Sequence, residues 1–96
     1  MPLTVGLLVL ELRVISSASL KDKRRVVRSL LDRVRARCNV AAAEVDHQDL
    51  HQRAQLAFAA VATSEAPLDR LFDHIVAQAE DLVPGGVTEV ARDFLG

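Results

Sequence analysis

The stretch SLKDKRRVVRSLLDRVRARCNV, residues 19–40, decides the fold of this 96-residue chain, because it has the pattern of a capped amphipathic helix between two segments of β character. Ser19 is a typical N-cap residue, and Asp22 places a carboxylate favourably in the first turn. Asn39 ends the helix. The apolar side chains that recur at helical spacing are Leu20, Val27, Leu30, Leu31 and Val34.

The segments on either side of this helix have the composition of strands. Before it, LTVGLLVLELRV (residues 3–14) is aliphatic and rich in β-branched residues, and a polar break from Ser16 to Ser19 follows. After it, Val40–His47 and Arg53–Thr63 also have β character, and the polar residues 48–52 separate them. These two segments therefore predict a β-hairpin.

The C-terminal third of the chain predicts a second helix and a last strand. Ser64 is placed to cap the helix, and Pro67 lies in its first turn, where a missing N–H costs little. Its apolar stripe consists of Leu68, Leu71, Phe72, Ile75, Val76, Ala79 and Leu82. Pro84-Gly85-Gly86 ends the helix, and Val87–Leu95 alternates as a strand.

The order of elements is thus β-α-β-β-α-β within a single domain, residues 1–96. The compact solution for this order is an α+β, ferredoxin-like split β-α-β-β-α-β sandwich, in which a four-stranded antiparallel sheet carries both helices on one face. Its first and third strands are central, and its other face is open.

Composition and cysteine usage suggest a compartment. The lone Cys38 excludes an internal disulfide and fits a reducing cytosol. The apolar segment from Leu3 to Leu12 is too short to span a bilayer and lacks the marks of a signal peptide. We therefore expect a cytoplasmic protein with no membrane association.

The stretch of residues 19–40, the motif AEVDHQD at residues 43–49 and the pair Arg53-Ala54 together resemble the YlxP-like family of small bacterial proteins, a domain of unknown function. The similarity covers nearly the whole chain. It implies a ferredoxin-like fold and a bacterial cytosolic protein, often encoded near translation and ribosome-maturation factors. It carries over no catalytic residues.

Positive charge is concentrated on the first helix. Eight of the twelve Lys and Arg residues lie between Lys21 and Arg37, opposed there by two aspartates. Cations spaced one helical turn apart can follow a nucleic-acid backbone. The candidate phosphate-contacting residues are Lys21, Lys23, Arg24, Arg25, Arg28 and Arg35.

Two other interpretations of these cations remain open. They could pair with the acidic second helix, which carries Glu65, Asp69, Asp73, Glu80 and Asp81, or they could form a merely solvated face. Base stacking on the sheet is not expected, because the first strand has no aromatic residue and the third has only Phe58.

The hairpin sequence EVDHQDLH, residues 44–51, is a candidate partner-binding surface. Its polar members are Glu44, Asp46, His47, Asp49 and His51. Carboxylates and imidazoles can bind metal, but strand alternation places Glu44 and Asp46 on one face and His47 on the other, so no metal is expected. A turn alone also favours such residues. With no nucleophile or oxyanion donors beside the acid–base candidates, we expect neither an enzyme nor a cofactor.

The first strand is apolar on both faces, which suggests that each face is covered. We assign Leu8, Leu10 and Leu12 to the face that the helices leave open, where they would form the interface of a homodimer. Alternatively, the last strand with Phe94 covers this face in a monomer. A small-molecule ligand between subunits is not expected.

These features predict a binding protein without catalytic activity. The leading hypothesis is an accessory factor that contacts structured RNA or the ribosome through the basic first helix. The alternative is a homodimeric protein-interaction module that uses the Asp46–His51 hairpin and the open sheet face.

Overall fold

The computed structural model describes residues 2–15 and 18–96, so Ser16 and Ser17 of the expected polar break lie outside the described residues. The elements occur in the predicted order, β-α-β-β-α-β. They are β1 (Thr4–Arg13), α1 (Leu20–Arg37), β2 (Ala41–Asp46), β3 (Arg53–Ala62), α2 (Glu65–Leu82) and β4 (Val87–Leu95). Each predicted strand and helix is confirmed to within a few residues at its ends.

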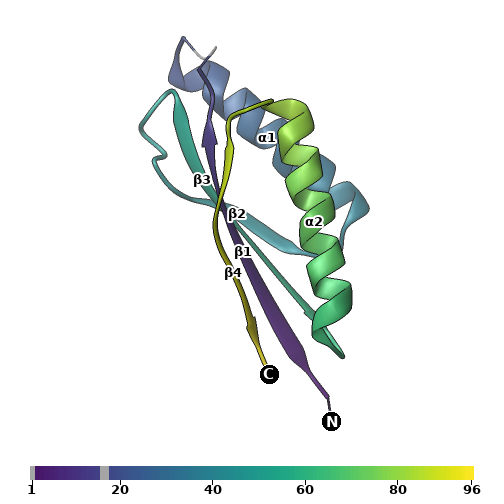
Figure 1. The fold of residues 1–96 in the computed structure, drawn as a ribbon. Helices are drawn as coiled ribbons and strands as arrows, with labels where there is room; N and C mark the ends of the chain where they lie inside the picture. Colours follow the sequence, from purple (N-terminus) through teal and green to yellow (C-terminus); the bar gives the residue numbers. More distant parts are fainter. Residues whose placement is uncertain (1, 16–17) are drawn as a thin grey trace.

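The four strands form one antiparallel sheet in the order β2-β3-β1-β4. Both helices cover the same face of this sheet, and no other described element covers the opposite face (Figure 1). The central strands β1 and β3 pair in a register that places Leu8 opposite Phe58, and Val5 of β1 pairs with Leu95 of β4. The predicted ferredoxin-like sandwich is therefore confirmed.

Helix caps define the helix ends. Ser19 has an extended backbone and its Oγ accepts a hydrogen bond from the Asp22 N–H at 3.2 Å, while Asp22 Oδ2 accepts one from the Ala18 N–H at 3.3 Å. Ser64 occupies the N-cap position of α2, but its side chain makes no capping hydrogen bond. After α2, Gly85 adopts a φ of 73°, a left-handed conformation that glycine reaches without a steric penalty.

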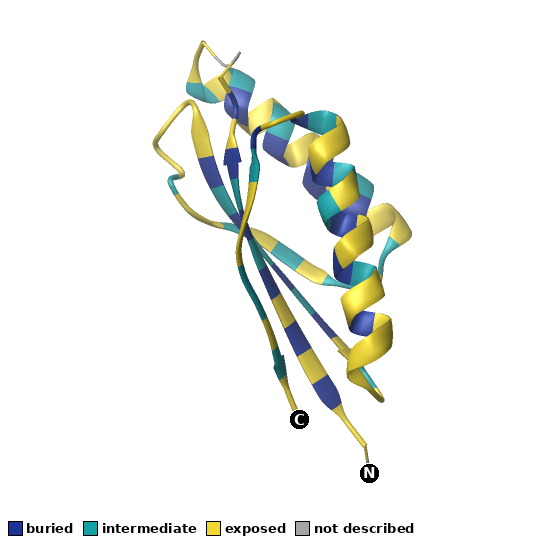
Figure 2. Ribbon diagram, viewed as in Figure 1, coloured by how far each residue is buried: buried dark blue, intermediate teal, exposed yellow. Residues whose placement is uncertain are grey.

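Burial alternates along β1, as the bands on this strand show in Figure 2. Leu8, Leu10 and Leu12 are each 0% exposed and lie in the core beneath the helices. The assignment of these three leucines to the open face is therefore wrong. Because side chains alternate with a period of two and both sets are apolar, a shift of one residue exchanges the faces.

The close packing of α2 on β1 explains which of the two alternating sets of apolar side chains on β1 faces the helices. A Cβ at Gly6 would lie 2.8 Å from Phe72 Cζ and 2.9 Å from Phe72 Cε2, so glycine allows this ring to approach the strand. Gly6 and Leu8 share the inward face, and Val5 and Leu7 consequently point outward.

Phe94 of β4 also packs on the helix side, where its ring stacks against Phe72 at a centroid distance of 5.9 Å. The alternative in which Phe94 covers the open face is therefore wrong. Neither α1 nor α2 is long and apolar enough to cross a membrane.

Candidate functional site

The exposed flank of α1 that faces away from α2 carries most of the helix's positive charge. We call this surface the basic flank, and it consists of Lys21, Arg24, Arg25, Arg28 and Arg35. The first four of these line a shallow recess together with Ser29 and Asp32. A second recess of about 290 Å³, between α1 and β2, is lined in part by Arg24, Arg28, Arg35 and Glu44.

Most cations of the basic flank are available to a ligand. Within residues 2–15 and 18–96, no carboxylate lies within 4.0 Å of the charged groups of Lys21, Arg24, Arg25 and Arg28. Arg35 Nη2 donates a hydrogen bond to the Ala42 carbonyl of the edge strand β2 at 2.5 Å, although its side chain remains exposed.

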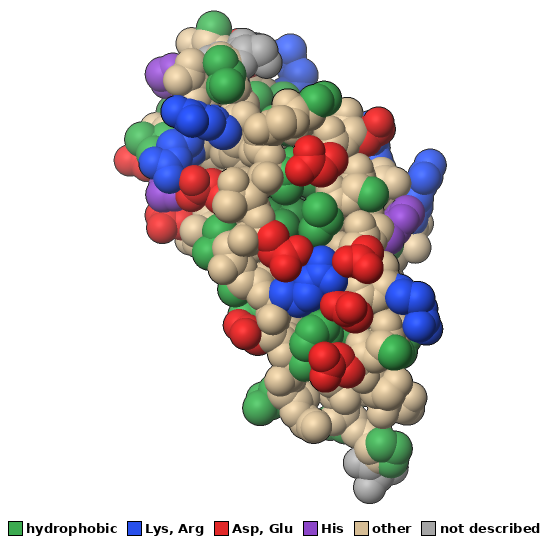
Figure 3. All heavy atoms as spheres, in the orientation of Figure 1, with side chains coloured by type: hydrophobic (Ala, Val, Ile, Leu, Met, Phe, Trp, Pro, Cys, Tyr) green, Lys and Arg blue, Asp and Glu red, His purple; other side chains and the backbone are tan. Residues whose placement is uncertain are grey.

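Two acidic residues of α2, Asp69 and Asp73, are bound by a cation of β4. Arg92 of β4 forms ion pairs with Asp69 at 2.7 Å, with Asp73 at 2.8 Å and with Glu89 at 2.8 Å. Figure 3 shows acidic side chains gathered around basic ones on the face formed by α2 and β4. Burial acts to lower the pKa of Arg92, but hydrogen bonds to Asp69, Glu89 and Asp73 outweigh it and hold the pKa above its ordinary value.

Pairing between the two helices is limited. In the described part of the chain, only Arg33 and Asp81 form an ion pair between α1 and α2, at 3.4 Å, and both side chains are exposed to solvent. Arg33 lies on the side of α1 opposite the basic flank. The acidic helix therefore leaves the basic flank unneutralised, contrary to the interpretation in which the two helices pair.

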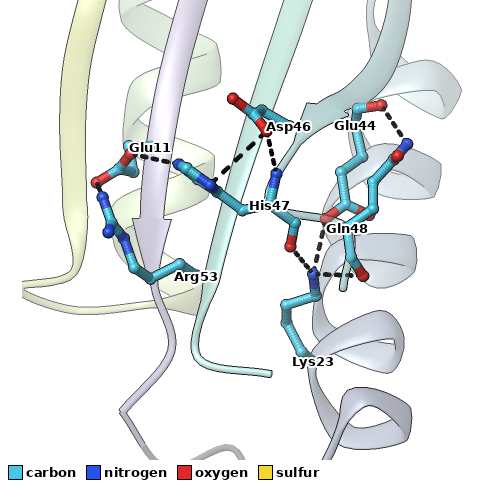
Figure 4. A network of polar contacts seen from close by, with 7 residues as sticks. All are labelled: Glu11, Lys23, Glu44, Asp46, His47, Gln48 and Arg53. Carbon is cyan, nitrogen blue, oxygen red and sulfur yellow. Dashed lines mark hydrogen bonds and ion pairs between the residues drawn. The ribbon is translucent and has the colours of Figure 1, made fainter. Parts of the chain in front are cut away.

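Lys23 does not belong to the basic flank. Its side chain is 0% exposed, and its Nζ donates hydrogen bonds to Glu44 Oε2 at 2.9 Å, to the His47 carbonyl at 2.7 Å and to the Gln48 carbonyl at 3.3 Å (Figure 4). The prediction that Lys23 contacts nucleic acid is therefore wrong. Lys23 precedes Val27 by one helical turn, so its side chain lies on the same face of α1 as the apolar stripe. Because exposed cations surround Lys23 in the sequence, this position is easily mistaken for one of them.

The polar residues of the hairpin are engaged within the chain to different degrees. Glu44 binds Lys23, and Asp46 Oδ1 accepts a hydrogen bond from the His47 N–H at 2.8 Å. His47 adopts a φ of 61°, and its Nε2 lies 3.1 Å from Glu11 Oε1 of β1. Asp49 and His51 are exposed at the turn. Structural contacts therefore account for Glu44, Asp46 and His47, whereas Asp49 and His51 have their side chains exposed to solvent.

Glu11 and Arg53 were not predicted as site residues, yet they link this network to the open face of the sheet. Arg53 Nη2 lies 2.7 Å from Glu11 Oε2. This hydrogen bond with Arg53 is the main cause that lowers the pKa of Glu11; burial opposes it, and His47 assists it. Glu11 and Arg53 are diagonal neighbours across β1 and β3. This relation can be recognised in the sequence only when the register between the two strands is known.

Metal-ligating side chains do not converge in the part of the chain that the structure describes, since no three His, Cys, Asp or Glu residues gather there. The chemistry that the side chains of the basic flank offer is charge recognition. An array of exposed guanidinium and ammonium groups binds phosphate oxygens by charge-assisted hydrogen bonds.

Comparisons with known proteins identify one family. The family described as "Protein of unknown function (DUF503)" matches residues 5–92. The "Uncharacterized protein YlxP" of Bacillus subtilis (strain 168) is 32% identical over 73 residues, which make up 76% of this chain and 79% of that protein. Both matches agree with the resemblance seen in the sequence.

A solved structure supports the fold from a more distant protein. A C-terminal segment of the alpha subunit of aIF2 from Pyrococcus abyssi superposes with a TM-score of 0.63 over 97% of this chain, at 10% sequence identity. The chain spans 52% of the length of that segment. At this identity the likeness concerns the fold alone.

Proposed function

This chain belongs to the DUF503 family, which matches residues 5–92, and we propose that it is a bacterial binding protein that contacts the phosphates of structured RNA through its basic flank. In this proposal the protein works without catalysis, as an accessory factor of RNA or of the ribosome. The lone Cys38 fits a reducing cytoplasm, where we place this activity.

One observation carries the proposal. Lys21, Arg24, Arg25 and Arg28 are exposed and form no ion pair among the described residues, while the acidic residues Asp69 and Asp73 of α2 are bound to Arg92. Cations that served only to neutralise the acidic helix would be paired with it. Unpaired cations clustered on one flank instead create a local positive field that attracts a polyanion.

The geometry of the flank suits backbone contact. Residues 21 and 35 are separated by 14 helical positions, or about 21 Å along the axis. Cations recur roughly once per turn from Lys21 to Arg28, and Arg35 follows two turns later, beyond Asp32. RNA-recognition sheets stack bases on exposed aromatic rings. Phe58 and Phe72 are 0% exposed, and Phe94 packs against the helix side. Recognition by phosphate position and shape is therefore the mode that these residues support.

The test is a fluorescence-anisotropy titration of a labelled fragment of structured ribosomal RNA at several salt concentrations. The test variant is Arg25→Gln/Arg28→Gln, and the matched control is Arg37→Gln/Arg70→Gln, which removes the same charge from exposed positions elsewhere. We expect the test variant to bind more weakly and to flatten the dependence of log K on log salt by about 1.4–1.8, since each phosphate contact contributes about 0.7–0.9.

Two results would contradict the proposal. One is the absence of binding by the wild-type protein at low salt. The other is an equal loss of affinity in both double variants, which would indicate an effect of net charge rather than of position. Either result would favour the competing proposal of a protein-interaction module, in which the exposed Asp49 and His51 of the hairpin contact a protein partner.

A further inference from the structure

The uncovered face of the sheet is apolar over most of its length. We call it the open face. The outward residues Val5, Leu7, Val61 and Leu95 are 36%, 39%, 65% and 76% exposed. Alanines occupy its centre and, with Leu7, line a shallow recess of about 240 Å³; those on the open face are Ala41, Ala43, Ala57 and Ala59. A contiguous apolar surface of this kind is rare on a soluble monomer and marks an interaction site.

The charged residues of the open face lie at its margins. At the hairpin end, Glu11 is held by Arg53 and His47, so its carboxylate already has partners within the chain. Asp93 lies opposite Leu7 on the edge strand β4, and Arg13 ends β1. A second apolar surface could therefore cover the area between β1 and β3, with the carboxylate of Asp93 left on the edge strand at a polar rim that water still reaches.

We propose that two copies of this chain associate through their open faces to form a homodimer. Small alanine side chains allow two sheets to approach to about 10 Å, the spacing of stacked sheets. A two-fold arrangement places the same patch of each copy against the other, so an apolar face without directional groups is self-complementary. This interface is independent of the basic flank, which lies on the helix side of the molecule.

The size of the face is sufficient for a specific dimer. Its strands contain 10, 6, 10 and 9 residues, and at about 3.3 Å per residue and about 4.8 Å per strand they cover roughly 550 Å². Two copies would bury roughly 1,100 Å², just above the lower limit of about 1,000 Å² for specific interfaces. Interfaces near this limit are weak or transient, so we expect a dissociation constant between the micromolar and the millimolar range.

Other occupants fit the face less well. A base-stacking nucleic acid needs aromatic rings, and Phe58, on the central strand β3, is 0% exposed on the helix side of the sheet. A charged peptide would need charges at the centre of the face, where alanine, valine and leucine stand. A second copy of the chain requires neither exposed aromatic rings nor charges at the centre of the face.

The test is sedimentation equilibrium of the full chain without RNA, from about 1 μM to about 1 mM, a range that spans the expected dissociation constant. Leu7→Glu places a carboxylate at the centre of the proposed interface. The matched control is Leu50→Glu, which makes the same substitution at a similarly exposed leucine (42%) in the hairpin turn. We expect the wild type and Leu50→Glu to dimerise equally, and Leu7→Glu to dimerise at least about 100-fold more weakly.

A second variant tests the interface independently of Leu7. Circular dichroism checks that each protein used is folded. Val61→Glu changes the exposed large hydrophobic residue of β3 and is expected to weaken the dimer without affecting the monomer fold. The proposal is overturned if the wild type stays monomeric to about 1 mM, or if folded Leu7→Glu and Val61→Glu both dimerise like the wild type. A monomeric wild type would leave the open face to a different protein.

Discussion

Lys23 is the residue whose environment differs most from what its neighbours suggest. It lies among exposed cations along the chain, yet its Nζ is buried against Glu44 and two backbone carbonyls of the hairpin. These contacts tie the first turn of α1 to the loop between β2 and β3. A buried charge of this kind is retained only when each of its hydrogen bonds is satisfied, which makes Lys23 a structural residue.

We expect Lys23→Met to lower the free energy of unfolding by about 3 kcal/mol, because it leaves the Glu44 carboxylate and the two carbonyls without their donor. The matched control is Lys21→Met, which makes the same change at an exposed position two residues away and should alter stability by less than about 0.5 kcal/mol. Urea denaturation measures both. Equal losses in the two variants would show that Lys23 has no special structural role.

The two variants should differ in RNA affinity in the opposite sense to their difference in stability. Lys21→Met removes a cation of the basic flank and should weaken binding, whereas Lys23→Met removes a cation that RNA cannot reach. The anisotropy titration described above, performed at a temperature where both variants are folded, distinguishes them.

Glu11 predicts a pH dependence of stability. Its pKa is lowered from 4.5 in the folded state, chiefly by the hydrogen bond with Arg53, so its ionised form is favoured by folding. Because the folded pKa is below the unfolded one, this stabilisation is present above pH 4.5 and is lost as the pH falls through the folded pKa. The pair is close to the surface, which limits the effect to about 1 kcal/mol.

We therefore expect Glu11→Gln to be less stable than the wild type at pH 7, and we expect this difference to shrink as the pH falls below 4.5 and Glu11 of the wild type becomes protonated. Thermal unfolding of both proteins across this range measures the difference. A difference that does not shrink as the pH falls below 4.5 and through the acid limit of folding would rule out ionisation of Glu11 as its source.

At the scale of elements, the two helices begin at serines that play unequal roles. Ser19 Oγ accepts the Asp22 N–H and satisfies one of the free donors of the first turn of α1. Ser64 stands at the equivalent position of α2 with an extended backbone but no capping hydrogen bond from its side chain. The same residue type at the same position should therefore contribute differently to stability.

Ser19→Ala is expected to cost about 1 kcal/mol of unfolding free energy, the usual value for loss of an N-cap hydrogen bond. Ser64→Ala should cost less than about 0.5 kcal/mol, since it removes no such bond. Urea denaturation at neutral pH compares the two variants. A cost at Ser64 equal to that at Ser19 would mean that the Ser64 side chain caps α2 in solution.

At the scale of the whole molecule, charge and hydrophobicity are placed on different surfaces. The basic flank lies on α1 beside β2, the acidic residues gather on α2 and β4, and the apolar open face lies on the far side of the sheet. A homodimer formed through the open faces would leave the basic flank of each copy on its outer, helix-covered side. RNA binding and dimerisation are therefore compatible within one assembly.

The proposed dimer makes thermal stability depend on protein concentration. Each tenfold increase above the dissociation constant stabilises a chain by about 0.7 kcal/mol, half of the 1.4 kcal/mol per dimer, and should raise Tm by roughly 3–5 °C. Calorimetry at several concentrations measures this slope. Leu7→Glu should show a Tm that is constant with concentration, and a constant Tm in the wild type would argue against the dimer.

The sequence by itself determined the element order and hence the fold. Helix periodicity, the caps at Ser19 and Ser64 and the Pro84-Gly85-Gly86 stop are local signals, and each is legible within a few residues. The compact sandwich for that order then follows with few alternatives. The concentration of positive charge on the first helix was equally visible without the structure.

Only the tertiary structure decided which apolar face of β1 is buried, which cation of α1 is removed from solvent and which carboxylates are neutralised. The period-two pattern of β1 does not distinguish Leu8 from Leu7, because both are apolar. The close approach of Phe72 to Gly6, about 66 residues apart in sequence, places Leu8 on the buried face. Lys23 and Arg92 find their partners on other elements. Such pairings depend on how distant segments pack, and no local signal in the chain encodes them.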